Sequence, residues 1–215
     1  MNLKEIGLLR KLVYMWRNIR NRYSYQHGKK NRVENNGGVR VNSRIQIEGN
    51  NNQVVLEKGC LLLNSLIKVS GNDNLVVLKA GSYVSGAELW VEDDHCELSI
   101  GERTFVGHHS HLACTENGSK LTVGRDGMIS SYVQVRTGDS HVILDLEGNR
   151  LNPAKSVCIG DHCWLGEGAK VLKGVTLEGH NIVATGAIVA KSFGKNQLLG
   201  GVPAKVLKEN VTWES

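Results

Sequence analysis

The chain has 215 residues, of which 40% are hydrophobic, enough for one folded domain with a sizeable core. The formal net charge is +5, but nine Lys or Arg and a single acid fall within residues 1–33, so the remainder is net negative. No basic stripe with interleaved aromatic residues occurs in that remainder, which excludes nucleic acid as its expected partner.

The first segment, residues 1–37, is predicted to form a basic amphipathic helix and a linker. Apolar residues recur at helical spacing between Lys and Arg: Ile6, Leu9, Leu12, Val13, Trp16 and Ile19. The segment is too charged to span a bilayer and lacks the cleavage site of a signal peptide. Two interpretations stay open. The helix packs on the domain or on a neighbouring subunit, or residues 1–33 lie on an anionic membrane surface.

The cysteine content indicates a reducing compartment. The chain has five cysteines, an odd number, and no C-x-x-C pair: Cys60, Cys96, Cys114, Cys158 and Cys163. Because no secretion signal is present, we expect reduced thiols that are mostly small core residues. The expected location is the cytoplasm, with the inner face of the membrane as the site of any contact through the first segment.

Between residues 45 and 127 the sequence repeats at an offset of about 22 residues. Two columns of apolar residues result: Ile47, Val69, Val91 and Ala113 in one, and Leu56, Leu78, Ile100 and Val123 in the other. Each repeat also contains a polar hexamer (EGNNNQ, SGNDNL, EDDHCE, TENGSK) rich in residues that tolerate left-handed backbone in tight turns. The hexamers predict a polar ridge, which is either solvated turn or one wall of a groove for a long polar substrate.

After the stretch VRTGDSH the repeat stops, and it resumes only near residue 157. From there every sixth residue is aliphatic: Ile159, Leu165, Val171, Leu177, Val183 and Val189. A period of six fits neither a helix nor a plain strand, so each unit must turn a corner. Three units close a triangular coil of about 18 residues, and coils stack in parallel about 4.8 Å apart. The sequence predicts an all-β, three-faced solenoid with a protruding loop at residues 138–156.

Three motifs resemble those of the hexapeptide-repeat acyltransferases: TGDSH, IGDHCWLGEGAKVLKGVTLEGHNIVATGAIVAKSF and GGVPAKVLK. Enzymes of that family are left-handed parallel β-helices, typically homotrimers, that transfer an acetyl group from acetyl-CoA. The resemblance covers about residues 45–210 and is closest to bacterial sugar O-acetyltransferases, including those that modify capsular polysaccharides and sialic-acid polymers. It implies a left-handed β-helix over residues 38–203 and a short C-terminal helix and tail over 204–215.

The resemblance places the catalytic base at His141, at the start of the loop, and sets Trp164 beside this base and the pantetheine arm of CoA. A sugar hydroxyl attacks a thioester slowly unless a base removes its proton, and histidine, with an ordinary pKa near 6.5, suits that work. In the expected mechanism the acceptor oxygen attacks the acetyl carbonyl directly, and a backbone N–H holds the oxyanion. Asp139 is a candidate to orient the imidazole. A main-chain carbonyl is the alternative.

The resemblance also implies a set of residues that contact the cofactor. These are Trp164, Gly166, Thr185, Ala190, Lys191, Lys205 and Lys208. Lys205 and Lys208 take places where basic residues reach the phosphates, and a cationic cluster there suits the charge of CoA. Because the family's CoA groove lies between neighbouring coils of different subunits, we expect a homotrimer.

The cluster HHSH, residues 108–111, allows three interpretations. It is not expected to bind a metal, because no two histidines have the four intervening residues that a zinc-binding class of related solenoids uses. His108 and His109 are instead expected to line the acceptor side with Tyr132 and Arg136, where Arg136 suits the carboxylate of a sugar such as sialic acid. The remaining interpretation is an ordinary exposed turn.

The function expected from the sequence is O-acetylation of a sugar hydroxyl, in a bacterial surface polysaccharide such as a capsule or lipopolysaccharide, with acetyl-CoA as co-substrate and no metal. Two alternatives stay open: N-acetylation of an amino sugar, and a non-catalytic solenoid used for binding or structure. No nucleotide-sugar-binding domain precedes the solenoid to indicate an activated precursor.

Overall fold

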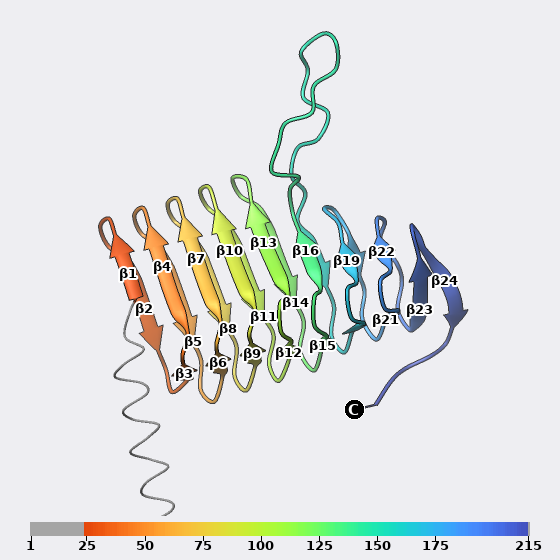
Figure 1. Cartoon of the computed structure of the whole chain (residues 1–215), viewed down its shortest axis with the longest axis horizontal. Helices are drawn as coiled ribbons and strands as arrows, with labels where there is room; N and C mark the ends of the chain where they lie inside the picture. Colours follow the sequence, from red (N-terminus) through yellow and green to blue (C-terminus); the bar gives the residue numbers. More distant parts are fainter. Residues whose placement is uncertain (1–23, 215) are drawn as a thin grey trace, which may run out of the picture.

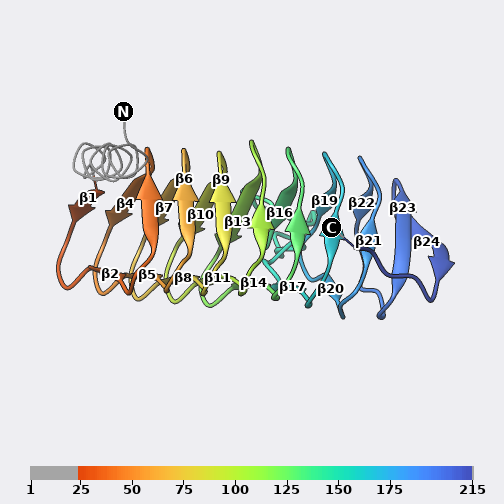
Figure 2. The same ribbon diagram turned by 90° about the horizontal axis from the view of Figure 1, so that it is seen from below.

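The chain forms a parallel β-solenoid whose coils stack along one axis (Figures 1 and 2). The computed structural model describes residues 24–214. The expected amphipathic helix lies outside these residues. Three sheets, named A, B and C here, form the three faces, and neighbouring strands pair in parallel except for the last pair, β23 and β24. Within the described range there is no helix, and so none that could cross a membrane.

Sheet A has eight strands, stacked in chain order. They are β1 (Ser24–His27), β4 (Arg44–Glu48), β7 (Leu66–Ser70), β10 (Glu88–Glu92), β13 (His111–Thr115), β16 (Gln134–Arg136), β19 (Lys170–Val171) and β22 (Ile188–Val189). Sheet B has seven strands. They are β2 (Arg32–Asn35), β5 (Gln53–Leu56), β8 (Leu75–Leu78), β11 (Glu97–Ile100), β14 (Lys120–Val123), β17 (Val157–Ile159) and β20 (Thr176–Leu177).

Sheet C has nine strands and ends in the single antiparallel pair. They are β3 (Val39–Val41), β6 (Leu61–Leu63), β9 (Tyr83–Ser85), β12 (Phe105–Val106), β15 (Met128–Ile129), β18 (Trp164–Leu165), β21 (Ile182–Val183), β23 (Gln197–Gly201) and β24 (Ala204–Glu209). The chain therefore passes from sheet A to B to C in each coil, and a corner separates each strand from the next.

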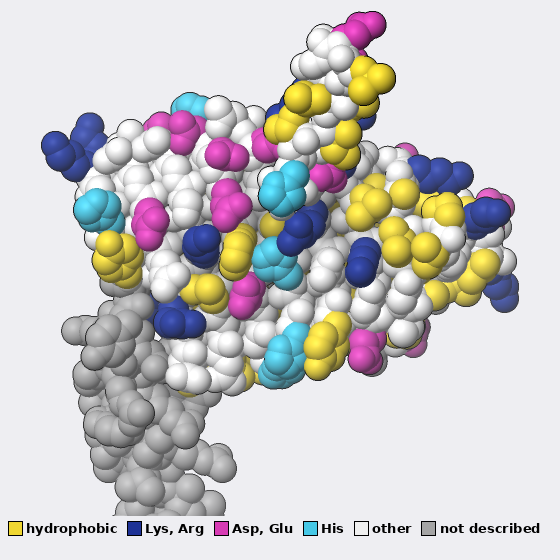
Figure 3. All heavy atoms as spheres, turned by 45° about the horizontal axis from the view of Figure 1, so that its top comes forward, with side chains coloured by type: hydrophobic (Ala, Val, Ile, Leu, Met, Phe, Trp, Pro, Cys, Tyr) yellow, Lys and Arg dark blue, Asp and Glu magenta, His cyan; other side chains and the backbone are white. Residues whose placement is uncertain are grey.

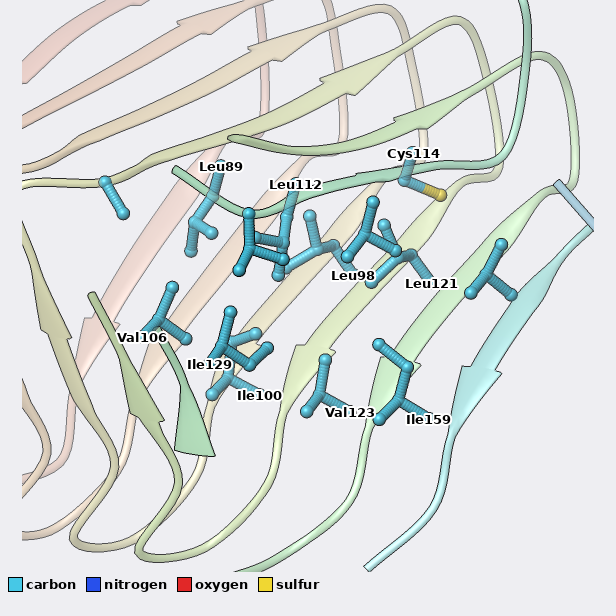
Figure 4. Close-up of a cluster of buried hydrophobic side chains, with 14 of the residues drawn as sticks. Leu89, Leu98, Ile100, Val106, Leu112, Cys114, Leu121, Val123, Ile129 and Ile159 are labelled. Carbon is cyan, nitrogen blue, oxygen red and sulfur yellow. The ribbon is translucent and has the colours of Figure 1, made fainter. Parts of the chain in front are cut away.

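The core is a column of aliphatic side chains inside the coils (Figure 4). All six residues of the six-residue period are buried, which confirms the predicted inward position of each. The column Leu56, Leu78, Ile100 and Val123 is likewise in register. One assignment was wrong: Cys114, not Ala113, lies opposite Val91, because the extra residue of that coil falls in the corner between Val106 and His111.

Asparagines fill the inside of the corner between sheets A and B. Asn52 and Asn74 are almost completely buried, although the sequence suggested a ridge of solvated turns. Asn74 Nδ2 donates to Asp93 O at 2.8 Å, and Asn74 Oδ1 accepts from Cys96 N at 2.8 Å. Asn52 makes the equivalent bonds one coil earlier, to Gly71 O and Asn74 N. The hexamers therefore contribute a coil-to-coil ladder of hydrogen bonds as well as an exposed ridge.

Glycine is required at the same corner. Gly49 and Gly71 have φ near +120°, at +118° and +120°. A Cβ at Gly49 would lie 1.8 Å from Gly71 O, and one at Gly71 would lie 2.0 Å from Asp93 O. The backbone of one coil thus passes so close to the next that no larger residue fits.

The solenoid begins earlier than the sequence indicated. Residues 24–37, assigned to the linker, include β1 and β2, which pair in parallel with β4 and β5. Their side chains are mostly polar or exposed, so the aliphatic repeat that marks the later coils is weak there. The backbone ladder extends one coil further than the hydrophobic pattern does.

The prediction of a C-terminal helix is wrong. Residues 204–209 form β24, which turns back at Val202 and Pro203 and pairs antiparallel with β23. Without β24 the last strand of sheet C would present unpaired backbone groups to solvent, and a returning strand satisfies them. The end of the solenoid is therefore closed by a hairpin rather than by a helix.

Replacing Asn74 by Ala is expected to lower the free energy of unfolding by about 1–3 kcal/mol, because Cys96 N would be left buried without a partner and Asp93 O would also lose its hydrogen bond. Denaturant titration followed by circular dichroism measures this. Asn117→Ala is the control, since exposed Asn117 makes one bond, to Asp94 N, and should change stability little. Equal stability of the two variants would contradict an internal Asn ladder.

Candidate active site

The loop between β16 and β17 projects from the corner at which sheet A passes into sheet B, as the break in the repeat predicted (Figure 1). Its limbs are joined by an antiparallel bridge between Leu144 and Arg150. Its tip turns on Asp145, whose Oδ1 accepts from the backbone N–H of Asn149 at 2.8 Å. Hydrophobic side chains are exposed along the limbs (Figure 3): Val142, Ile143, Leu144, Leu146 and Leu151.

His141 lies at the base of this loop with its side chain exposed. Its backbone oxygen accepts from Asn152 Nδ2 at 2.8 Å. Asp139, the candidate to orient the imidazole, has other partners: its Oδ2 accepts from Lys173 Nζ at 2.5 Å and from Asn152 Nδ2 at 2.9 Å. Neither Asn152 nor Lys173 was singled out in the sequence, since they lie 13 and 34 residues from Asp139.

Two ion pairs hold the loop base to the coils on either side. Asp139 pairs with Lys173, which belongs to the following coil. Arg150 pairs with Glu116, which belongs to the preceding coil, and the two side chains are 2.6 Å apart. The hydrogen bond from Lys173 lowers the pKa of Asp139, and that from Arg150 lowers the pKa of Glu116. Stability from a lowered carboxyl pKa is present above the ordinary range near 4 and is lost only as pH falls through the lower folded value. The loop base therefore keeps both pairs at neutral pH.

Trp164 lies on a different part of the surface, at the start of β18 in sheet C. Its indole is about one-third exposed, and Nε1 donates to Ser130 Oγ at 3.2 Å. Met128 is its neighbour on the previous coil, with Phe105 one coil before that. Within one chain, β17 of sheet B and its corners separate His141 from Trp164, so the structure does not bring this predicted pair together.

The C-terminal tail returns to the solenoid beside Trp164. Trp213 stacks on His162 with ring centroids 4.5 Å apart, and Nε1 donates to His162 O at 2.9 Å. His162 Nε2–H donates in turn to Trp213 O at 3.1 Å. The centroids of Trp213 and Trp164 are 6.1 Å apart. The sequence did not indicate this contact, because it joins residues 51 positions apart.

A cavity of about 860 Å³ lies under this tail at the corner between sheets B and C. It is lined by Met128, His162 and Trp213 and by two arginines, Arg103 and Arg125. Both arginines are bound by carboxylates: Arg103 Nε donates to Asp126 at 2.7 Å and Arg125 Nε to Asp161 at 3.0 Å. The paired charges make the cavity a poor site for several phosphates.

The residues expected to contact the cofactor lie on the later coils. Gly166 and Thr185 are adjacent, because a Cβ at Gly166 would be 2.7 Å from Thr185 N. Ala190 and Lys191 are exposed just after β22. Lys205 and Lys208 are exposed on β24. The described structure thus places the lysines expected at the phosphates towards the C-terminal end of the stack.

The residues expected to line the acceptor side fall at both ends of sheet A. His109 stacks on Tyr132 with centroids 4.9 Å apart, and His108 Nε2 is 3.3 Å from Ser85 Oγ; all lie at the corner before sheet A. Arg136 lies at the other end of β16, four residues after Tyr132. Its NH1 donates to Ser140 Oγ at 3.3 Å, beside His141. Only Arg136 of this set is therefore next to the loop base.

Titratable residues elsewhere offer no metal site in the described range, where no three His, Cys, Asp or Glu side chains converge. The third histidine of the cluster, His111, packs edge-on against Trp90, with centroids 5.0 Å apart. Burial, and then the charge of Arg136, lower the pKa of His111. Its imidazole is therefore neutral at pH 7.

Comparison with known proteins decides the family. No protein-family model matches the chain. A polysialic acid O-acetyltransferase of Neisseria meningitidis is 33% identical over 173 residues, which cover 80% of this chain and 79% of that protein.

The chain belongs to the hexapeptide-repeat acetyltransferases.

Two solved structures of acetyltransferases have the same fold as this chain. The polysialic acid O-acetyltransferase OatWY superposes with a TM-score of 0.85 at 28% identity, over 89% of this chain and 91% of that one. The polySia-specific acetyltransferase NeuO superposes with a TM-score of 0.79 at 28% identity, over 89% and 88%. The three-sheet solenoid is therefore shared by enzymes that act on a sialic-acid polymer.

Replacing Trp213 by Ala is expected to release the tail of the acetyltransferase, because both the stack on His162 and the Nε1 hydrogen bond are lost. Carboxypeptidase should then remove the C-terminal residues several-fold faster than from the unmodified protein, as followed by mass spectrometry. Trp213→Phe keeps the stack without the hydrogen bond and should be intermediate. Thr212→Ala, a change at an exposed residue, is the control. Equal digestion rates for all variants would contradict the anchoring role.

Proposed function

We propose that this acetyltransferase transfers the acetyl group of acetyl-CoA to a hydroxyl of a sialic-acid-containing surface polysaccharide. The observation that carries the proposal is the match, over four-fifths of the chain, to a protein described as a polysialic acid O-acetyltransferase. The expected left-handed winding of the solenoid is part of the proposal. The position of Arg136 supports an acidic acceptor, because it lies beside the loop base and has no carboxylate partner among residues 24–214.

In the proposed reaction His141 removes the proton of the acceptor hydroxyl as the oxygen attacks the acetyl carbonyl carbon. A backbone N–H stabilises the resulting oxyanion. The C–S bond then breaks, and the imidazolium returns its proton to the CoA thiolate. The products are an O-acetylated sugar and free CoA. The exposure of the His141 side chain supports this role, since an acceptor can reach it.

We also propose that the active site forms between copies of the chain in a homotrimer. His141 and Trp164 lie on different parts of one chain, so a site containing both needs a neighbouring subunit. The exposed hydrophobic limbs of the loop suit packing against such a neighbour. The cofactor would then lie along the later coils, with its phosphates near Lys191, Lys205 and Lys208.

Replacing His141 by Ala is expected to lower kcat by about 10²–10⁴-fold, the usual contribution of a general base, with little change in the KM for acetyl-CoA. Release of CoA is measured with acetyl-CoA and a panel of sialic-acid polymers, neutral capsular polysaccharides, free sugars and amino sugars. Among the five cysteines only Cys158 is exposed, so a thiol reagent needs a protein-only blank. Unchanged turnover would contradict His141 as the base. Release only with amino sugars, with the acetyl group found on the nitrogen of the product, would contradict O-acetylation.

Mixing inactive subunits tests whether the site is shared. Separate His141→Ala and Trp164→Ala variants should each have low activity, but co-expressed chains assembled at random into cyclic trimers should recover about one-quarter of the unmodified activity. Three in four such trimers are mixed, and each mixed trimer has one intact interface. Analytical ultracentrifugation checks the mass. No recovery in isolated mixed trimers would mean that both residues act from the same chain.

A further inference from the structure

The base of the loop holds His141 through one buried side chain. Asn152 is 7% exposed, although it belongs to a loop that is otherwise largely exposed. Its Nδ2 donates to Asp139 Oδ2 at 2.9 Å and to His141 O at 2.8 Å, and its Oδ1 accepts from Ile143 N at 2.6 Å. The amide thus binds every second residue, 139, 141 and 143, of the loop segment that follows β16, as a neighbouring strand would.

The backbone of Asn152 is itself fixed to the solenoid. Lys173, from the next coil, donates from Nζ to Asn152 O at 3.0 Å and to Asp139 Oδ2 at 2.5 Å. Arg150 NH2 is 3.4 Å from the same Asn152 oxygen and also binds Glu116 of the preceding coil. Both limbs of the loop are therefore tied to rigid coils through Asn152.

These contacts constrain the main chain of His141 and leave its imidazole free. In residues 24–214 the imidazole has no hydrogen-bond partner, and Oδ2 of Asp139 is bound by Lys173 and Asn152. A reacting group displaced by about 1 Å can lose as much as 10²-fold in rate. Among the described residues, Asn152 is the side chain that bonds to the backbone of residue 141.

We propose that Asn152, held by Lys173 and Asp139, is the positioning residue that sets the place of His141 for proton transfer. This inference rests on the proposed role of His141 as the base. Asp139 acts in it through Asn152 and Lys173, without contact with the imidazole.

The test compares two asparagines of the same loop. Asn152→Ala is expected to lower kcat about 10- to 100-fold with less than a twofold change in the KM for acetyl-CoA. Asn149→Ala is the matched control, because the Asn149 side chain binds only Asp145 at the tip, at 3.0 Å from Nδ2, and its kcat should stay within twofold of the unmodified protein. Equal kcat values for the two variants would overturn the inference.

A double variant separates positioning from general damage. If Asn152 acts only through His141, then His141→Ala combined with Asn152→Ala should be no slower than His141→Ala alone. A further loss in the double variant would mean that Asn152 acts by another route, and would overturn the inference. If His141→Ala is as active as the unmodified protein, the proposed function fails first, and this outcome is distinct from the others.

Two more variants complete the experiment. Lys173→Met keeps the aliphatic part of the side chain and removes its charge. It should lower kcat several-fold while the protein stays folded. If Asn152→Ala does not fold, Lys173→Met is used in its place. Asp139→Asn keeps an oxygen that accepts from Lys173 and Asn152 but loses the ion pair, so it should lower kcat no more than Lys173→Met does. A loss in Asp139→Asn as large as in His141→Ala would instead favour a direct contact between Asp139 and the imidazole and overturn the inference.

Discussion

The whole structure depends on the parallel backbone ladder between one coil and the next. Each strand of a coil pairs with its counterpart one turn away, so every corner must stack on the corner before it. At Gly49 and Gly71 this stacking brings backbones so close that a Cβ would overlap a carbonyl oxygen. Any added residues must therefore leave the body outward, at a corner. The loop that carries His141 is a long insertion at such a corner, and the extra residue between Val106 and His111 is an insertion of a single residue at another.

The same constraint explains why polar residues are buried at the corners. A corner interrupts the sheet, so its backbone groups need other partners. Asn52 and Asn74 supply them from inside the coil, each bonding a carbonyl oxygen and an N–H of the following coil. Asn152 repeats this chemistry in the loop, where its amide takes an N–H and a carbonyl of a segment that has no strand beside it. Asparagine is used in both places as a substitute for a neighbouring strand.

Much of the fold was predictable because it is periodic. The six-residue aliphatic period fixes which side chains point inward, and the 22-residue offset aligns the longer coils, so three faces and one loop follow from the sequence. The first coil was missed because residues 24–35 join the ladder through their backbone, with few aliphatic side chains to mark it. The C-terminal strand was missed because its only cause is the open edge of β23, a feature of the assembled stack.

The candidate site was predictable only in part, for a related reason. The position of His141 could be inferred from the break in the repeat and from the resemblance of its motif. The partners of Asp139 could not, because Asn152 and Lys173 approach it only after the loop has closed and the next coil has stacked. From the sequence, Asp139 was one candidate to orient the imidazole, with a main-chain carbonyl as the alternative. In the folded chain a nearby ammonium and a buried amide compete for that carboxylate and bind it at 2.5 and 2.9 Å.

In this arrangement different groups meet two requirements that oppose each other at a reactive histidine. The side chain must be open to a large acceptor, yet it must also be placed accurately. Burying the imidazole would meet the second requirement at the expense of the first. Fixing the backbone through Asn152 and anchoring that residue to the coils on both sides, through Lys173 and the pair of Arg150 with Glu116, meets both. A solenoid is well suited to this, because every loop that leaves a corner has a rigid coil above and below it to which its base can be tied.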